Sequence, residues 1–154
     1  MNRITRAIMV LVLLTASQGG WAEEGGVMIS GAWIREAPPN ATTLAGYMVM
    51  RNHSNIRQIL VGATSGEFER IMMHQTVLEG GTVKMVHRHK LDLPRGVTVE
   101  FKPGGYHLML MNPKRRLLSG DRVTIDLQFS EGATLTTQFV VRKTAGLSTE
   151  SHDH

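Results

Sequence analysis

The sequence predicts an all-β fold, built as an antiparallel sandwich or barrel. Short runs in which every second residue is apolar alternate with turn signals rich in Gly and Pro, and little of the chain shows helical periodicity. Because no helical crossovers separate the runs, antiparallel pairing is favoured over a parallel sheet. A chain of 154 residues, 42% of them hydrophobic, suffices for one domain with a real core.

Eight or nine strands are expected from about residue 27 onward, and nine candidate runs are visible. The alternation is clearest at residues 97–101 and 123–129, where the apolar side chains share one face. In chain order the strands are expected at residues 27–34, 45–52, 58–63, 70–78, 83–87, 97–101, 106–111, 123–129 and 135–141. The turn signals between them are Pro38-Pro39-Asn40, Glu79-Gly80-Gly81, Pro94-Arg95-Gly96, Pro103-Gly104-Gly105 and Ser119-Gly120-Asp121.

Both ends of the chain are expected to lie outside this domain. Arg3 and Arg6 precede an apolar stretch at residues 7–16, and Gly20-Trp21-Ala22 has the small-x-small pattern of a signal-peptidase site. A stretch of about ten residues is shorter than the roughly 20 that span a bilayer, which favours a secretory signal over a membrane anchor. We therefore expect a signal peptide at 1–22, export to the periplasm, a β-domain at 23–143 and a flexible tail at 144–154.

Composition excludes several classes of site. The chain has no cysteine, which rules out disulfides, thiolate zinc sites, iron–sulfur clusters, cysteine nucleophiles and blue copper. Without residues 1–22 the formal net charge falls from +4 to +2, since two of the 17 basic residues and none of the 13 acidic ones are lost. A nucleic-acid role thereby loses its main support. The dense basic run Lys114-Arg115-Arg116 is interpreted as a solvated loop rather than a docking site.

Methionine and histidine are the most informative residue types, with ten and seven copies. His107 and Met109 lie two residues apart on one expected strand, so they share a face, about 7 Å apart along the backbone. Met111 continues that face. Leu108 and Leu110 point the other way, which predicts an internal strand with one side toward the core.

A hairpin around Glu79-Gly80-Gly81 is expected to supply a second pair, His74 and Met85. If Glu79-Gly80 forms the loop, His74 lies directly opposite Met85; if Gly80-Gly81 forms it, His74 faces His87 and Met85 is one diagonal away. Both registers place these side chains on one side of the sheet, and the sequence leaves the choice between them open.

Two imidazoles with two thioethers indicate copper. Thioether sulfur is soft and neutral, so it favours Cu(I) over calcium, magnesium or manganese, whereas zinc normally recruits thiolate or carboxylate. Taken singly, a strand methionine is usually core filler and a lone histidine is usually structural. The complete spacing His-x10-Met-x21-His-x-Met is what favours a site made of His74, Met85, His107 and Met109.

This spacing resembles the signature of the periplasmic copper chaperone family called PCuAC. Further similar segments are Gly31-Ala32-Trp33-Ile34-Arg35 with Pro38-Pro39, Ala45-Gly46-Tyr47 before Arg51-Asn52, and residues 102–111 (KPGGYHLMLM). The resemblance covers about residues 32–141. It implies a cupredoxin-like β-sandwich (a Greek-key barrel) that carries Cu(I) at an exposed site. It also implies delivery toward the dinuclear copper centre of cytochrome c oxidase, with oxidase subunit II and Sco-type proteins as partners.

The chain departs from the family pattern around Met85. His87 lies on the Met85 face, Met72 on the His74 face and Met111 on the His107 face, so all three are candidate auxiliary ligands. The tail residues His152 and His154 form a candidate second site, whose harder donors suit Cu(II). A solvated terminus without metal is the alternative for the tail.

The expected function is a copper carrier that is monomeric, not an enzyme, and binds no nucleic acid. No catalytic triad, paired carboxylates or phosphate loop is visible. Three alternatives remain at this stage: a small copper oxidoreductase, a periplasmic copper buffer that shares the site, and a sandwich adhesin or assembly module with incidental methionines.

Overall fold

A computed structural model describes residues 26–144 and shows ten β-strands and no helix in that range. The strands are β1 (Val27–Arg35), β2 (Thr43–Asn52), β3 (Gln58–Thr64), β4 (Phe68–Glu79), β5 (Thr82–His87), β6 (Leu91–Leu93), β7 (Thr98–Phe101), β8 (Tyr106–Pro113), β9 (Arg122–Phe129) and β10 (Thr134–Arg142). The all-β prediction is confirmed. Residues 26–144 therefore contain no helix that is long and apolar enough to span a bilayer.

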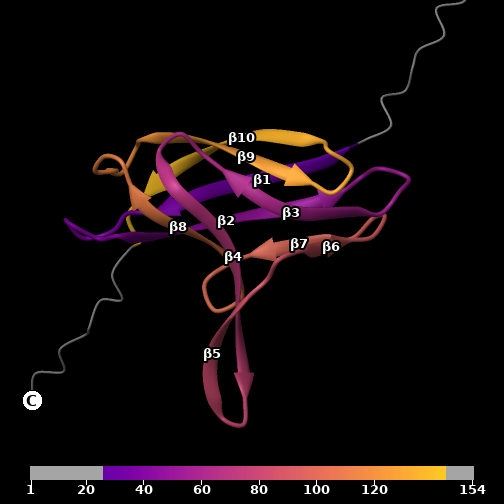
Figure 1. Ribbon diagram of the computed structural model, residues 1–154, viewed down its shortest axis with the longest axis horizontal. Helices are drawn as coiled ribbons and strands as arrows, with labels where there is room; N and C mark the ends of the chain where they lie inside the picture. The colour runs from indigo at the N-terminus through magenta and orange to yellow at the C-terminus, as the bar shows by residue number, and fades with distance from the viewer. Residues whose placement is uncertain (1–25, 145–154) are drawn as a thin grey trace, which may run out of the picture.

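The strands form one hydrogen-bonded sheet in the order β5-β4-β8-β7-β2-β1-β10-β9-β3-β6, and β8 also pairs with β2. The sheet curls over on itself, so that β9 and β10 run along one side of the body and β6 and β7 along the other (Figure 1). Most pairs are antiparallel, as expected. Two pairs are parallel, β1 with β10 and β7 with β8.

The core lies inside the curled sheet and is built by alternate residues of its strands. Along β9 every second side chain, from Val123 to Phe129, is buried. Leu108 and Leu110 of β8 are also fully buried in this core. Each such side chain contributes about 1.5–3 kcal/mol relative to its exposed state. Burial on one face thus fixes which side chains of β8 point outward.

All nine expected strands are present, with ends shifted by a few residues. The tenth, β6, was missed by the sequence analysis. It is only three residues long, and its buried leucines, Leu91 and Leu93, flank an exposed aspartate. A run this short carries too little alternation to be recognised as a strand.

The β4–β5 hairpin extends out of the body (Figure 1). Its pairing of Glu79 with Thr82 leaves Gly80-Gly81 as the two-residue loop. Both glycines have positive φ, 57° and 77°, which a two-residue type I′ hairpin turn requires and which glycine adopts without strain. Of the two registers that the sequence left open, the one with the Gly80-Gly81 loop is therefore the one that forms.

Candidate metal centre

The two faces of β8 have separate roles. Leu108 and Leu110 enter the core, while His107 and Met109 lie on the opposite face, as the alternation predicts. His107 is 8% exposed and Met109 is half-buried. β8 is internal, with β4 on one side and β2 and β7 on the other; Met109 pairs with both Met72 and Ala45, and His107 pairs with His74.

Three histidines form a row across β5, β4 and β8. His74 is the direct cross-strand partner of His87 on one side and of His107 on the other. Their ring centroids lie 5.2 Å (His74–His87) and 5.9 Å (His74–His107) apart. A fourth imidazole, that of His89, lies close by: its ring centroid is 4.2 Å from that of His87.

The methionines lie on either side of this row. Met72 is directly opposite Met109, one step toward the body of the sheet. Met85 is opposite Thr76, one step toward the hairpin tip, and is 65% exposed. Met85 is therefore diagonal to His74 rather than facing it. Met111, the third auxiliary candidate, pairs with Arg70 at the far end of β8.

A hollow of about 290 Å³ brings three of the four predicted ligands together. Met85, His107 and Met109 line it on the side of the β4–β5–β8 face. The other wall is formed by the end of β1, the segment after it and the start of β2, namely Arg35, Glu36, Ala37, Pro38, Thr43, Leu44 and Ala45. His74 is not in the lining but is the cross-strand neighbour of His107. The structure thus gathers His74, Met85, His107 and Met109 on one face beside one hollow.

A hydrogen bond to the backbone determines which ring nitrogen of His107 is free to bind a metal ion. Its Nδ1 lies 3.1 Å from the Gly105 carbonyl oxygen, which can only accept, so Nδ1 carries the proton. In the neutral ring, Nε2 then keeps its lone pair for a metal ion.

His74 is prepared differently. Its Nδ1 is buried and has no hydrogen-bond partner. Burial lowers the pKa of His74 below its usual value, and the nearby His87 and His107 lower this pKa further. A histidine binds a metal ion only as neutral imidazole. An environment that disfavours the protonated ring therefore keeps His74 in the form that can bind a metal ion.

The donor set of this face fits a soft ion. Within residues 26–144 no three His, Asp or Glu side chains are placed to hold a metal ion together. A site with three or more protein donors here therefore depends on the thioethers of Met85 and Met109, and thioether with imidazole is a set that Cu(I) favours.

Arg35 was missed as a site residue by the sequence analysis. Its guanidinium carbon lies 5.9 Å from the Tyr47 ring centroid, and its Nε is buried without a hydrogen-bond partner. Arg35 lines the hollow that contains His107 and Met109. The only signal in the sequence was its place in the segment Gly31–Arg35, whose role depends on contacts between distant strands.

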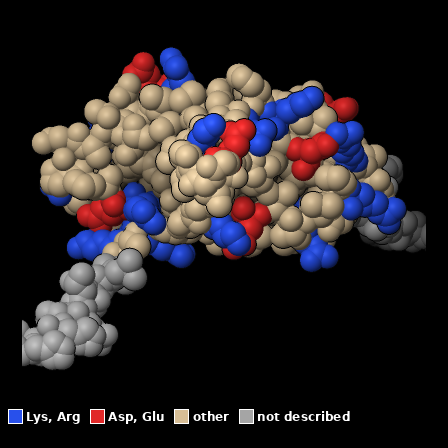
Figure 2. Space-filling model, turned by 90° about the horizontal axis from the view of Figure 1, so that it is seen from below, with Lys and Arg blue, Asp and Glu red and all other residues tan. Residues whose placement is uncertain are grey.

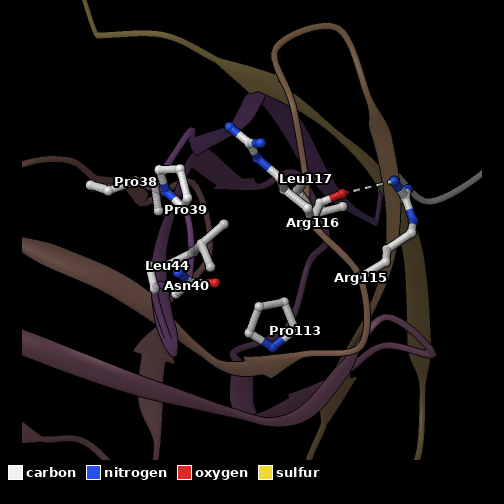
Figure 3. A pocket seen from close by; sticks show the side chains of 10 residues that line it. Pro38, Pro39, Asn40, Leu44, Pro113, Arg115, Arg116 and Leu117 are labelled. Carbon is white, nitrogen blue, oxygen red and sulfur yellow. Dashed lines mark hydrogen bonds between the residues drawn. The ribbon is translucent and has the colours of Figure 1, made fainter.

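One residue of the basic run, Arg115, forms ion pairs. Arg115 donates hydrogen bonds to Glu67 and Asp121, both at 2.9 Å, and Lys114, Arg115 and Arg116 are all exposed. Arg115 and Arg116 border a separate hollow of about 320 Å³ against Pro38, Pro39 and Pro113 (Figure 3). On the side from which the hairpin projects, positive and negative side chains are interspersed (Figure 2). This face therefore carries charges of both signs.

Two sets of predicted features lie outside the described residues. These are the signal segment at 1–22 and the tail histidines His152 and His154.

Comparison with known proteins identifies the family. The family model described as "Putative lipoprotein LpqE-like" matches residues 27–141, so the chain belongs to the LpqE-like family. The curated protein "Putative lipoprotein Lxx21020" of Leifsonia xyli subsp. xyli is 31% identical over 145 residues, 86% of each chain. "Uncharacterized protein RP573" of Rickettsia prowazekii is 36% identical over 91 residues, 56% of this chain and 49% of that protein.

Solved structures show the same fold and define its class. The copper-bound PCuAC domain from PmoF2 superposes with a TM-score of 0.66 over 78% of this chain and 95% of that one, at 22% identity. The copper(I) form of DR1885 from Deinococcus radiodurans is 33% identical, with a TM-score of 0.63 over 84% of this chain and 87% of that one. The expected membership of the PCuAC family and its cupredoxin-like β fold are thereby confirmed.

Proposed function

We propose that this protein is a periplasmic copper chaperone that carries Cu(I) on His74, Met85, His107 and Met109. One observation supports this most strongly: four residues from three strands, spread over 36 positions of sequence, lie on a single outward face beside one hollow. The similarity to a protein solved in its copper(I) form supports the choice of ion.

Transfer of copper would proceed by ligand exchange. The exposed Met85 is the donor that a docked partner reaches first, while His107 and Met109 are held in the sheet. Four neutral donors leave the site with the single charge of Cu(I), which is less costly to half-bury than a divalent ion. The partner would replace the four donors one at a time, without a change in oxidation state.

The ligand set is tested by Cu(I) competition against a chromophoric chelator. The variants His107→Ala and Met109→Ala should each lower Cu(I) affinity about tenfold or more, which corresponds to about 1.4 kcal/mol. Met28→Ala is the matched control, because Met28 is an exposed methionine on β1, outside the candidate ligand set. Unchanged affinity in both His107→Ala and Met109→Ala would contradict the proposed site.

The proposed recipient is the cytochrome c oxidase copper centre, with oxidase subunit II or a Sco-type protein as partner. Deleting the gene separates delivery from buffering, since both functions use the same site. Delivery predicts loss of oxidase activity at low copper. Normal oxidase activity together with sensitivity to high copper would instead identify a copper buffer.

A further inference from the structure

A second pair of imidazoles lies at the base of the projecting hairpin. His87 and His89 are both exposed, and neither ring has a hydrogen-bond partner within residues 26–144. Arg88, between them, is turned to the other face, where its Nε and Nη2 donate to Gln75 Oε1 at 3.0 and 2.8 Å. Its backbone N–H donates to the Met73 carbonyl at 2.9 Å, which continues the β4–β5 ladder past His87. The backbone thus holds both rings on the side of the metal centre.

If two imidazoles bind the same metal ion, the distance between their ring centroids depends on the angle between the two metal–nitrogen bonds. A metal–nitrogen bond of about 2.0–2.1 Å plus about 1.1 Å from nitrogen to ring centre places each centroid about 3.2 Å from the metal. Two such rings at right angles then have centroids about 4.5 Å apart, and two rings at the tetrahedral angle about 5.2 Å apart. The His87–His89 separation of 4.2 Å is close to the right-angle value, whereas the His74–His87 separation of 5.2 Å equals the tetrahedral value. The His74–His107 separation of 5.9 Å requires a wider angle.

Adjacent imidazoles at a right angle are the arrangement of tetragonal Cu(II) sites, which take nitrogen and oxygen donors. We propose that His87 and His89 form a separate binding site for Cu(II), with water completing its coordination. The third imidazole, His74, is outside this site, because no three His, Asp or Glu side chains of residues 26–144 are placed to hold an ion together.

The charges around the pair set the strength of this site. Arg88 is directed to the opposite face, but Lys90 follows His89 directly and is exposed. The nearest acidic side chain in sequence, Asp92, forms an ion pair with Arg57. No carboxylate therefore supplements the two nitrogens, and the site should hold Cu(II) less tightly than a four-donor protein site.

The inference goes beyond the proposed function, since it assigns the two oxidation states of copper to different residues. Cu(I) binds where thioethers are present, and Cu(II) binds at the exposed nitrogen pair. No electron transfer between the two sites is involved.

Electron paramagnetic resonance of the full chain titrated with copper(II) sulfate tests the proposal. All variants carry His152→Asn and His154→Asn, so that tail imidazoles do not contribute to the spectrum. His89→Asn and His87→Asn should each remove one bound Cu(II) and its nitrogen hyperfine pattern. His53→Asn is the matched control, because His53 is an exposed histidine in the segment after β2, and should keep both.

Cu(I) stoichiometry is measured on the same proteins, and His89→Asn should retain it. Retention of Cu(II) in both His87→Asn and His89→Asn would overturn the proposal, as would its loss in His107→Ala alone, which would place Cu(II) at the thioether site. If Cu(II) behaves as proposed but no variant or parent binds Cu(I), the proposed chaperone function fails while this site stands.

Discussion

Two adjacent methionines of β4 show how strand geometry assigns different roles to the same residue type. Met73 is 4% exposed and lies in the core, whereas Met72 is half-buried on the face that carries the proposed copper ligands. Successive side chains of a strand point to opposite faces. The position along β4 therefore decides which methionine packs in the core and which is a candidate ligand.

The pair allows a matched test of this assignment. Met73→Ala should lower the free energy of unfolding of the apo protein by about 2–5 kcal/mol, because it leaves a cavity in the core. Met72→Ala should change it by less than about 1 kcal/mol. Chemical denaturation measures both, and equal losses in the two variants would show that the faces are wrongly assigned.

The lowered pKa of His74 has a consequence for stability. In the unfolded chain a histidine takes up its proton near pH 6.5, whereas folded His74 does so at lower pH. As pH falls below about 6.5, the unfolded state therefore gains a proton that the folded state lacks, and the free energy of unfolding decreases until the folded pKa is reached.

The variant His74→Gln removes the contribution of His74 to the pH dependence of the free energy of unfolding. The apo variant should lose less stability than the parent between about pH 7.5 and pH 5, with urea denaturation as the measurement. An identical loss in the two proteins would mean that burial beside His87 and His107 does not disfavour the charged form of His74.

At the residue scale, alternation along a single strand sufficed to predict that His107 and Met109 share a face and that Leu108 does not. The contribution of Arg35 to the hollow was not predictable in this way. Arg35 reaches it because β1, β2 and β8 are neighbours, and that adjacency depends on pairing between distant segments.

At the scale of elements, the β4–β5 hairpin determines where Met85 lies. The sequence allowed two registers, since Glu79-Gly80 and Gly80-Gly81 are both acceptable loops. The Gly-Gly loop forms because both of its positions have positive φ, which glutamate adopts only with strain. Local turn chemistry thus moves His87, rather than Met85, opposite His74.

Substitution in this turn should weaken both stability and copper binding. Gly81→Ala places a side chain at φ 77° and should cost about 1–2 kcal/mol. It should also lower Cu(I) affinity, because a loosened turn no longer fixes Met85. Gly66→Ala is the control, since Gly66 has open space around it and no positive φ. Comparable loss of stability in the two variants, measured by thermal unfolding, would argue against a constrained turn.

At the scale of the whole molecule, the sequence predicted the all-β class and nine strands but not their order. Strand order is set by long-range packing, and neither the β1–β10 nor the β7–β8 parallel pair leaves a local signal. The consequence of the order is functional. It places β4, β5 and β8 side by side at one end of the sheet, so that their outer face can bind an ion while their inner face, through β4 and β8, completes the core.

X-ray absorption at the copper edge of the Cu(I)-loaded chain tests the central claim most directly. The sample should carry His152→Asn and His154→Asn, so that the spectrum reports residues of the β-domain. The account predicts sulfur neighbours together with imidazole nitrogen, and loss of sulfur scattering in the Met85→Ala, Met109→Ala double variant. A spectrum with only nitrogen and oxygen neighbours in the parent protein would contradict it.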